Sequence, residues 1–224
     1  MKSSHHPDLA SLFSYSSGGL PTQFSIVISA HLSICRKCSE KVSLYNELGG
    51  VSMEDIADID LSQGALNKFM NVITKENSDE LSINNDNKND QQEDKNIKMP
   101  FPLAKYIGSS VEKIRWRYLA PGIKRFSILI EGEANTYLSL LQIAPGKKIP
   151  QHTHTGEEMT FVVSGSFQDE TGVYKIGDIA DHDEDIEHQP TVLGKHPCIC
   201  IVATEGPMIF RSFFANLFQS FYRI

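Results

Sequence analysis

The sequence has no excess of basic residues. Its 21 lysine and arginine residues are outnumbered by 28 aspartate and glutamate residues, which gives a formal net charge of −7. A nucleic-acid-binding face needs clustered lysine and arginine, so this balance argues against direct contact with DNA or RNA. If such a chain acts on transcription, we expect it to act through another protein.

Long apolar runs are also missing. No stretch approaches the roughly 18 apolar residues that predict a membrane span, and residues 1–19 lack the apolar segment of a signal peptide. We therefore expect a cytoplasmic protein with no membrane partner. Cysteine is scarce, with four residues among 224. In that compartment cysteines are more often metal ligands, redox thiols or core residues than disulfide partners.

Large apolar residues almost disappear between residues 76 and 98, where Asn, Asp, Gln, Glu and Lys dominate. Such a segment cannot bury enough surface to offset chain entropy, which predicts a flexible polar linker. We therefore expect two domains, a helical one over residues 1–75 and a β-rich one over residues 99–224.

The helical part carries apolar residues at helical spacing. Residues 22–50 form a long apolar-rich run that closes on a glycine pair, which is a common stop signal for a helix. Further along, positions i, i+3, i+4 and i+7 make one apolar helical face: Leu66, Phe69, Met70 and Ile73. This face either packs in the core of the domain or docks on a partner protein.

Metal-ligand side chains recur within the long helical run. If one helix holds His31, Cys35 and Cys38, their spacing of four and three residues places all three on one face. Imidazole and thiolate ligands in a tetrahedral array suit zinc, and a closed structural site needs a fourth ligand. The tandem pair His5 and His6 offers one, and spacing does not separate the two neighbours. A metal would also stabilise a domain of this small size.

The second part of the chain looks rich in β-strands. Short β-branched or aromatic runs are separated by Gly, Pro and Asp, which predicts an antiparallel sandwich or barrel. The runs start at residues 126, 136, 159, 173, 198 and 208.

A second set of metal-ligand residues lies in this part. His152 and His154 alternate along a strand and so point to the same side. Glu158 can reach the same centre from the following strand, and two histidines with one carboxylate hold Zn, Fe, Mn or Ni. His182 and His188 are the candidates for a fourth ligand.

Two further cysteines, Cys198 and Cys200, share one face of a predicted strand. We interpret them as small core residues. A redox pair is the alternative, although neighbours at i and i+2 are awkward for an unstrained disulfide.

The two motifs together resemble a known family. His31-x3-Cys35-x2-Cys38 in a small helical domain resembles the zinc-binding anti-sigma factors of bacteria, and the surrounding residues 5–50 resemble their ChrR branch. Members of that branch carry a C-terminal cupin domain, an all-β barrel of jelly-roll type. The resemblance implies a two-domain protein with an all-α zinc-binding domain first. It also implies His6 rather than His5 as the fourth zinc ligand.

The run from Gly146 through His152, His154 and Glu158 to Gly165 matches the spacing of the first cupin motif. The resemblance therefore places a divalent metal, zinc or another such as iron or manganese, in the barrel.

The second cupin motif is less regular. It starts at Gly177 and places His188 at the expected distance, so the resemblance favours His188 over His182 as the fourth ligand. However, Asp183, Asp185 and Val192 stand where the usual motif has Pro, Gly and Asn. The turn chemistry of this motif therefore departs from the family pattern.

The resemblance implies a regulator rather than an enzyme. Such a protein sequesters an extracytoplasmic-function (ECF) sigma factor of the sigma-E type and releases it on oxidative stress of the singlet-oxygen type. Its cupin domain would act in the response, with an unknown small-molecule signal as one option. We expect residues 1–75 to inhibit on their own, with Leu66, Phe69, Met70 and Ile73 in the sigma-binding surface.

Two alternatives remain from the residues alone. The barrel could be a metal-dependent enzyme of the dioxygenase or isomerase class, because its metal has open coordination positions. It could also be a metal or ligand sensor whose N-terminal zinc only stabilises a dimer.

Overall fold

A computed structural model gives the fold of the protein. It describes residues 3–54, 56–57, 59–79, 99–108, 111, 114–130, 136–206 and 208–210. The chain forms two compact units, residues 1–49 together with 96–224, and residues 50–95. This division differs from the predicted boundary at residue 75, because the first helices pack on the β-sheet. From residue 80 on, the predicted linker lies outside the described residues.

Five helices are described: α1 (Leu9–Ser16), α2 (Thr22–Leu32), α3 (Arg36–Glu54), α4 (Ala65–Asp79) and α5 (Phe101–Ile107). The long helical run does not form a single helix, since it breaks between α2 and α3. The Ser33 hydroxyl donates to the carbonyl of Ala30 at 2.7 Å, and the Ser33 backbone N–H donates to the carbonyl of Ser29 at 3.1 Å. Side-chain bonds of this kind compete with helix continuation.

The predicted stop at Gly49 and Gly50 is wrong, because α3 continues to Glu54. A glycine ends a helix when it takes a left-handed conformation. Neither residue of this pair has a positive φ.

The β-rich part is an antiparallel sandwich. Its strands are β1 (Arg117–Ala120), β2 (Ile123–Ile128), β3 (Thr136–Ile143), β4 (His152–His154), β5 (Glu158–Ser164), β6 (Ser166–Gln168), β7 (Val173–Lys175), β8 (Ile179–His182), β9 (Thr191–Val192), β10 (Cys198–Glu205) and β11 (Met208–Phe210). The large sheet has the order β1-β2-β3-β10-β5-β8. A three-stranded sheet, β7-β6-β9, and a pair, β11-β4, complete this β-domain. Helices followed by a β-sandwich confirm the predicted fold class.

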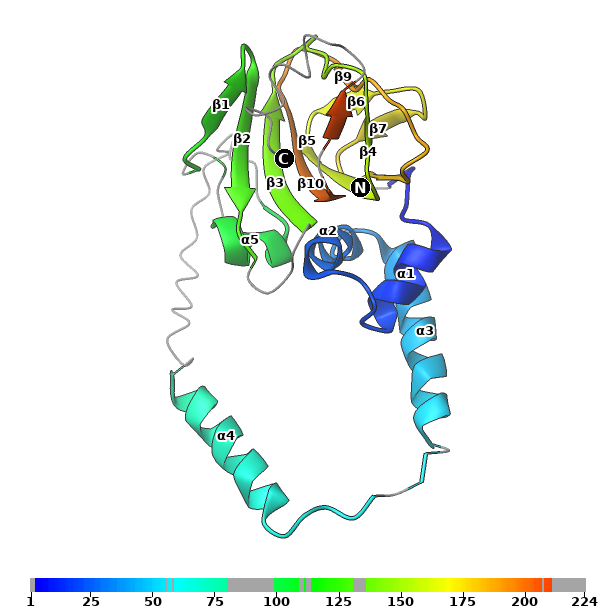
Figure 1. Cartoon of the computed structure of the whole chain (residues 1–224), viewed down its shortest axis with the longest axis vertical. Helices are drawn as coiled ribbons and strands as arrows, with labels where there is room; N and C mark the ends of the chain where they lie inside the picture. The colour runs from blue at the N-terminus through cyan, green and yellow to red at the C-terminus, as the bar shows by residue number, and fades with distance from the viewer. Residues whose placement is uncertain are drawn as a thin grey trace, which may run out of the picture. The chain divides into compact units, whose positions relative to one another are not determined.

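The large sheet has two buried faces. Along β10, Ile199 and Ile201 join the apolar cluster that includes α2, whereas Cys200 and Val202 join the cluster in the interior of the β-domain. The alternation of side chains along a strand produces this separation. Figure 1 shows α2 lying against the end of strands β3 and β10. The helix is buried along most of its length because the sheet supplies a second apolar surface.

Within the described residues, none of the helices combines the length and the apolar character that a membrane crossing requires.

Candidate metal centres

Four ligand side chains meet where the N-terminal helices join. One nitrogen or sulfur atom from each of His6, His31, Cys35 and Cys38 lies within 4.8 Å of the others. Nδ1 of His6 is 3.4 Å from Nε2 of His31 and 3.4 Å from the Sγ atoms of both cysteines. Metal–ligand bonds of about 2.0–2.3 Å in a tetrahedron give ligand separations of this size. The donor set therefore fits a metal such as zinc.

The break between α2 and α3 creates this cluster. His31 lies in the last turn of α2, Cys35 lies in the break, and Cys38 lies in the first turn of α3. The prediction of a single helical face is therefore wrong, although the ligand spacing that suggested it does bring the three side chains together. The N–H of Cys35 still bonds to the carbonyl of His31 at 2.8 Å, which keeps the turn tight.

The two neighbouring histidines have different surroundings. His6 belongs to the cluster, whereas His5 lies with its ring centroid 4.5 Å from that of Tyr174. Nδ1 of His5 is 3.4 Å from a carboxylate oxygen of Asp178. The geometry thus places His6, and not His5, beside His31.

Burial controls the protonation of the first cluster. It lowers the pKa of His31 to about 4, so this imidazole is neutral near pH 7 and offers a lone pair. It raises the pKa of Cys38 to about 11, with the neighbouring Cys35 as a second cause. A metal that binds the Cys38 thiol must therefore displace its proton.

The second cluster lies inside the β-domain and contains His152, His154, Glu158 and His188. Nε2 of His188 is 3.0 Å from Nε2 of His152 and 3.3 Å from Nε2 of His154. The carboxylate of Glu158 is 3.2 Å from His154 and 3.8 Å from His188. All four side chains are buried, and three imidazoles with one carboxylate suit zinc, iron or manganese.

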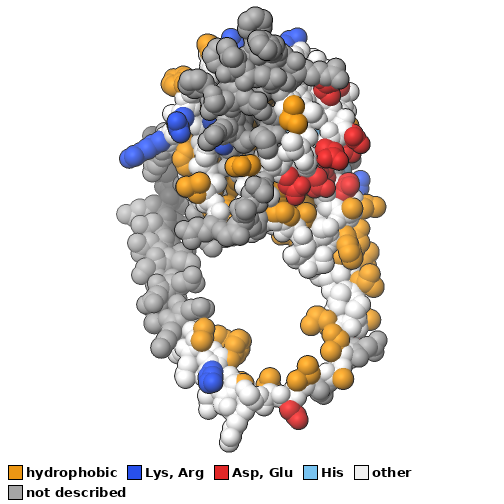
Figure 2. All heavy atoms as spheres, viewed as in Figure 1, with side chains coloured by type: hydrophobic (Ala, Val, Ile, Leu, Met, Phe, Trp, Pro, Cys, Tyr) orange, Lys and Arg blue, Asp and Glu red, His pale blue; other side chains and the backbone are white. Residues whose placement is uncertain are grey.

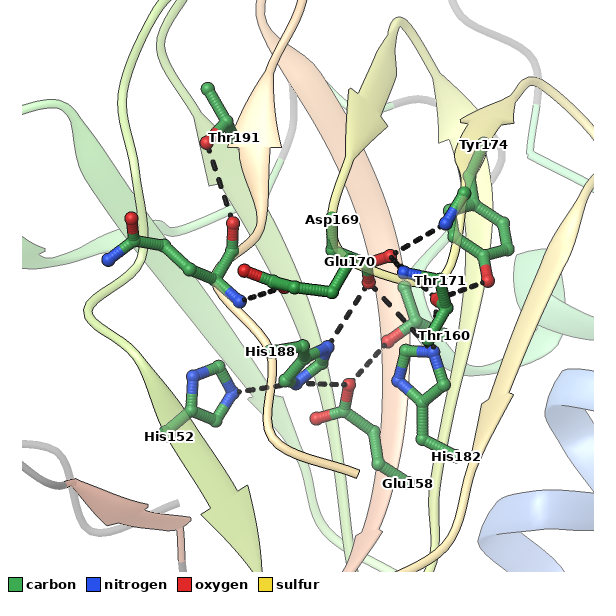
Figure 3. A network of polar contacts seen from close by, with 12 residues as sticks. His152, Glu158, Thr160, Asp169, Glu170, Thr171, Tyr174, His182, His188 and Thr191 are labelled. Carbon is green, nitrogen blue, oxygen red and sulfur yellow. Dashed lines mark hydrogen bonds and ion pairs between the residues drawn. The ribbon is translucent and has the colours of Figure 1, made fainter. Parts of the chain in front are cut away.

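Oxygen atoms next to Nδ1 orient two of these imidazoles. Nδ1 of His152 donates to the carbonyl of Pro150 at 2.8 Å, and Nδ1 of His188 lies 3.2 Å from Oδ2 of Asp169 (Figure 3). Such contacts direct Nε2 toward the shared centre. Sequence reasoning missed Asp169, because it follows β6 and lies 19 positions from its partner.

Asp169 is itself held in place by the turn that follows it. Its Oδ1 accepts hydrogen bonds from the backbone N–H groups of Thr171 and Gly172, at 2.9 and 3.2 Å. Its Oδ2 is left facing His188 and, at 3.9 Å, Nε2 of His182. His182, the rival fourth ligand of the sequence analysis, therefore groups with Asp169 and His188 rather than with the four-residue cluster.

Electrostatics suits cation binding in the second cluster. Burial lowers the pKa of His152 to about 4. Burial opposes ionisation of Glu158, but the surrounding histidines, His154 foremost, lower its pKa overall. Burial also acts against protonation of His188, yet the carboxylates of Asp169 and Glu158 raise its pKa. The site thus combines a buried negative charge with converging imidazoles.

A cavity of about 30 Å³ adjoins this cluster. His152, Glu158, His182 and His188 contribute to its wall, and the rest is mainly apolar, including Cys200. Pockets for metabolites usually span about 300–1,000 Å³. The space next to the cluster therefore suits a water-sized molecule.

Cys198 and Cys200 are buried, with their sulfur atoms 3.5 Å apart, and both are free thiols. They belong to the apolar cluster in the interior of the β-domain. This agrees with the interpretation as core residues, and neither joins a metal cluster found among the described residues.

The predicted apolar face of α4 is exposed. The exposed fractions are 64% for Leu66, 62% for Phe69, 51% for Met70 and 37% for Ile73. It therefore does not pack in a core among the described residues.

Helix α3 also exposes apolar side chains, Leu44 and Leu48 among them, and α1 exposes Leu9 and Phe13. Figure 2 shows hydrophobic side chains at the surface of both α3 and α4.

Comparison with known proteins gives consistent matches. A family model described as the ChrR cupin-like domain matches residues 105–208. The anti-sigma-E factor ChrR of Cereibacter sphaeroides is 35% identical over 220 residues, covering 98% of this chain and 98% of that protein. A crystal structure of Rhodobacter sphaeroides SigE in complex with the anti-sigma ChrR matches with 33% identity and a TM-score of 0.74. The match covers 92% of this chain and 100% of the matched chain in that structure. KdgF from Halomonas sp. is 17% identical, with a TM-score of 0.37 over 42% of this chain and 89% of that chain.

Proposed function

Because the chain belongs to the family of the anti-sigma-E factor ChrR, we propose that it binds an ECF sigma factor of the sigma-E type and keeps that factor from RNA polymerase. The observation that carries this proposal is the end-to-end match to ChrR, solved as a complex with SigE. The cupin-like β-domain acts as a regulatory part of the protein rather than as an enzyme. The match to an anti-sigma factor along nearly the whole chain supports this role.

The sigma-binding surface is built from exposed apolar side chains on the helices. The candidate for this surface is the face of α4 that contains Leu66, Phe69, Met70 and Ile73. Amphipathic helices with uncovered apolar faces are a common means of docking on a partner. The net charge of −7 suits a partner whose DNA-binding and polymerase-binding faces are basic.

Each cluster has its own metal in this proposal. Zinc held by His6, His31, Cys35 and Cys38 fixes the junction of α2 and α3 and so shapes the helical surface. Zinc, iron or manganese held by His152, His154, Glu158 and His188 serves the response to oxidative stress of the singlet-oxygen type. A stress signal that alters the β-domain releases the sigma factor in the cytoplasm.

Coexpression of the full chain with ECF sigma factors from the same genome tests the function. The expected result is an equimolar complex that carries metal and blocks transcription by the polymerase holoenzyme. A folded, metal-bearing chain that captures none of these sigma factors would contradict the proposal. Metal-dependent turnover of a small molecule would then favour the enzyme alternative, and a metal-linked dimer would favour the sensor alternative.

A further inference from the structure

The β-domain supplies a hydrogen-bond acceptor to the N-terminal cluster. Nδ1 of His31 donates to the carbonyl oxygen of Gly177 at 2.8 Å, across 146 positions of sequence. The bond turns Nε2 of His31 toward His6. A metal-ligating histidine commonly uses its other nitrogen in this way, which fixes both tautomer and ring orientation. Gly177 belongs to the turn between β7 and β8, so part of the first centre comes from the β-domain.

The next residue of that turn holds the segment that leads into His6. The buried carboxylate of Asp178 accepts hydrogen bonds from the Ser3 hydroxyl at 2.9 Å and from the Ser4 hydroxyl at 3.0 Å. It also accepts from the backbone N–H groups of Ser4 and His5, at 2.6 and 3.1 Å. Hydrogen bonds to an ionised carboxylate are stronger than neutral ones. They fix the backbone immediately before His6.

Two more contacts join the same edge of the β-domain to the helices. Gly177 has a φ of +92°, and a Cβ atom built there would lie 2.8 Å from Cδ1 of Ile34, in the loop between α2 and α3. On β8, the carboxylate of Asp181 accepts from the backbone N–H of Asp8 and the hydroxyl of Ser11, both at 3.1 Å. The turn and β8 therefore contact both segments that carry ligands of the first cluster.

We propose that the β7–β8 turn of the β-domain is a structural part of the N-terminal metal centre. Asp178 and the carbonyl of Gly177 are its positioning groups, and they act on the metal through His6 and His31. The inference rests on the metal centre proposed above and adds to it a means by which the β-domain controls metal retention. Metal at the first cluster is held less tightly when the turn is altered, even though no ligand changes.

Strand β8 connects this turn to the second cluster. Side chains alternate along the strand, so Asp181 faces the helices while His182 faces the interior. Nε2 of His182 lies 3.9 Å from Asp169, which contacts His188 of the second cluster (Figure 3). A change at the second metal that shifts β8 thus reaches the first metal through the turn.

Cobalt(II) provides a direct test with the full chain. Of the two clusters only the first contains thiolates, from Cys35 and Cys38, so its cobalt gives a thiolate-to-metal charge-transfer band that the second site does not give. We expect Asp178→Ala to speed the loss of this band to a chelator by about 10- to 100-fold. Asp185→Ala, an exposed aspartate of the same domain, is the control and leaves the rate unchanged.

A second variant guards against misfolding of the turn. Ser4→Ala removes one hydrogen bond to Asp178 and leaves the β-domain untouched, so a smaller acceleration in the same direction is expected. Ser17→Ala, which removes a hydroxyl that donates to the carbonyl of Ser14 in the same helical turn, is its matched control. If both Asp178→Ala and Ser4→Ala lose cobalt at the wild-type rate, the role of the turn is overturned while the proposed metal centre still stands. A wild-type chain that shows no thiolate band with cobalt would overturn the metal centre itself and the inference with it.

Discussion

The carboxylate of Asp169 lies 3.2 Å from Nδ1 of His188, and both side chains are almost fully buried. Oδ1 of Asp169 accepts hydrogen bonds from the backbone N–H groups of Thr171 and Gly172. Oδ2 is the oxygen that faces the imidazole. The contact holds His188 with Nε2 directed at His152 and His154. Proteins commonly place a carboxylate in this way to orient a histidine that ligates a metal.

Replacement of this carboxylate should therefore weaken the second metal centre. We expect Asp169→Asn to lower metal affinity there by about 10- to 100-fold, because the amide is a poorer acceptor for the imidazole N–H. Competition with a chelator, read by metal analysis of the protein, measures the change. Asp185→Asn provides an exposed control, and equal affinity in both variants would show that Asp169 does not orient the ligand.

The first centre should depend on its thiolates. Cys38→Ala removes one of four converging ligands, so we expect loss of about one metal ion per chain from the first cluster and loss of sigma-factor binding. Metal content of the purified protein and coelution with the sigma factor report the two effects. Cys198→Ala is the matched control, since this buried thiol lies outside both clusters, and it should keep the metal and the partner.

Exposed apolar residues on α4 should affect binding without affecting folding. Phe69→Glu changes a side chain that is 62% exposed, so we expect little change in the free energy of unfolding. If the complex buries Phe69 as an aromatic anchor, its loss should weaken sigma-factor binding by at least about 2 kcal/mol, or roughly 30-fold.

Titration of the complex by calorimetry measures this effect. Asn71→Glu adds the same charge on the opposite side of the helix, and similar weakening by both variants would argue against an apolar docking face.

Asp178 should make stability depend on pH in acid. Burial favours its neutral form, but hydrogen bonds from Lys175, Ser4 and His5 lower its pKa below the usual value of 3.8. As the pH falls, the Asp178 carboxylate therefore becomes protonated at a higher pH in the unfolded chain than in the folded chain. The stabilisation is complete above about pH 4 and is lost as the pH drops further toward the folded-state pKa.

Denaturant unfolding between pH 3 and pH 6 checks the prediction on wild type and Asp178→Asn, both stripped of metal. Wild type should lose stability more steeply below about pH 4, because the variant lacks the carboxylate. Parallel curves would mean that Asp178 is not specifically stabilised in the folded protein.

Residue types and local spacing were sufficient to find both clusters. His31, Cys35 and Cys38 lie within eight positions of one another, and His152, His154 and Glu158 lie within seven. His31, Cys35 and Cys38 converge because a tight turn, like one helical face, brings residues three and four positions apart together, so the break between α2 and α3 did not separate them. The choice of His6 and His188 came from family resemblance, since each lies far from the other ligands of its cluster.

Asp169, Gly177 and Asp178 could not be assigned from the sequence. Their roles depend on partners 19 to 175 positions away, and on which side of β8 each residue faces. Every residue has a backbone carbonyl, so the role of the Gly177 carbonyl as an acceptor cannot be read from the residue type. The packing of α2 against the large sheet decided these contacts, and it also joined the first helices to the β-domain.

Composition and spacing thus predicted helices before strands, the closely spaced members of two ligand clusters and an apolar face on α4, because each depends on nearby residues. The folded chain established that the first centre shares hydrogen bonds with the β-domain. Such contacts arise when buried polar groups from distant segments must find partners in one apolar core.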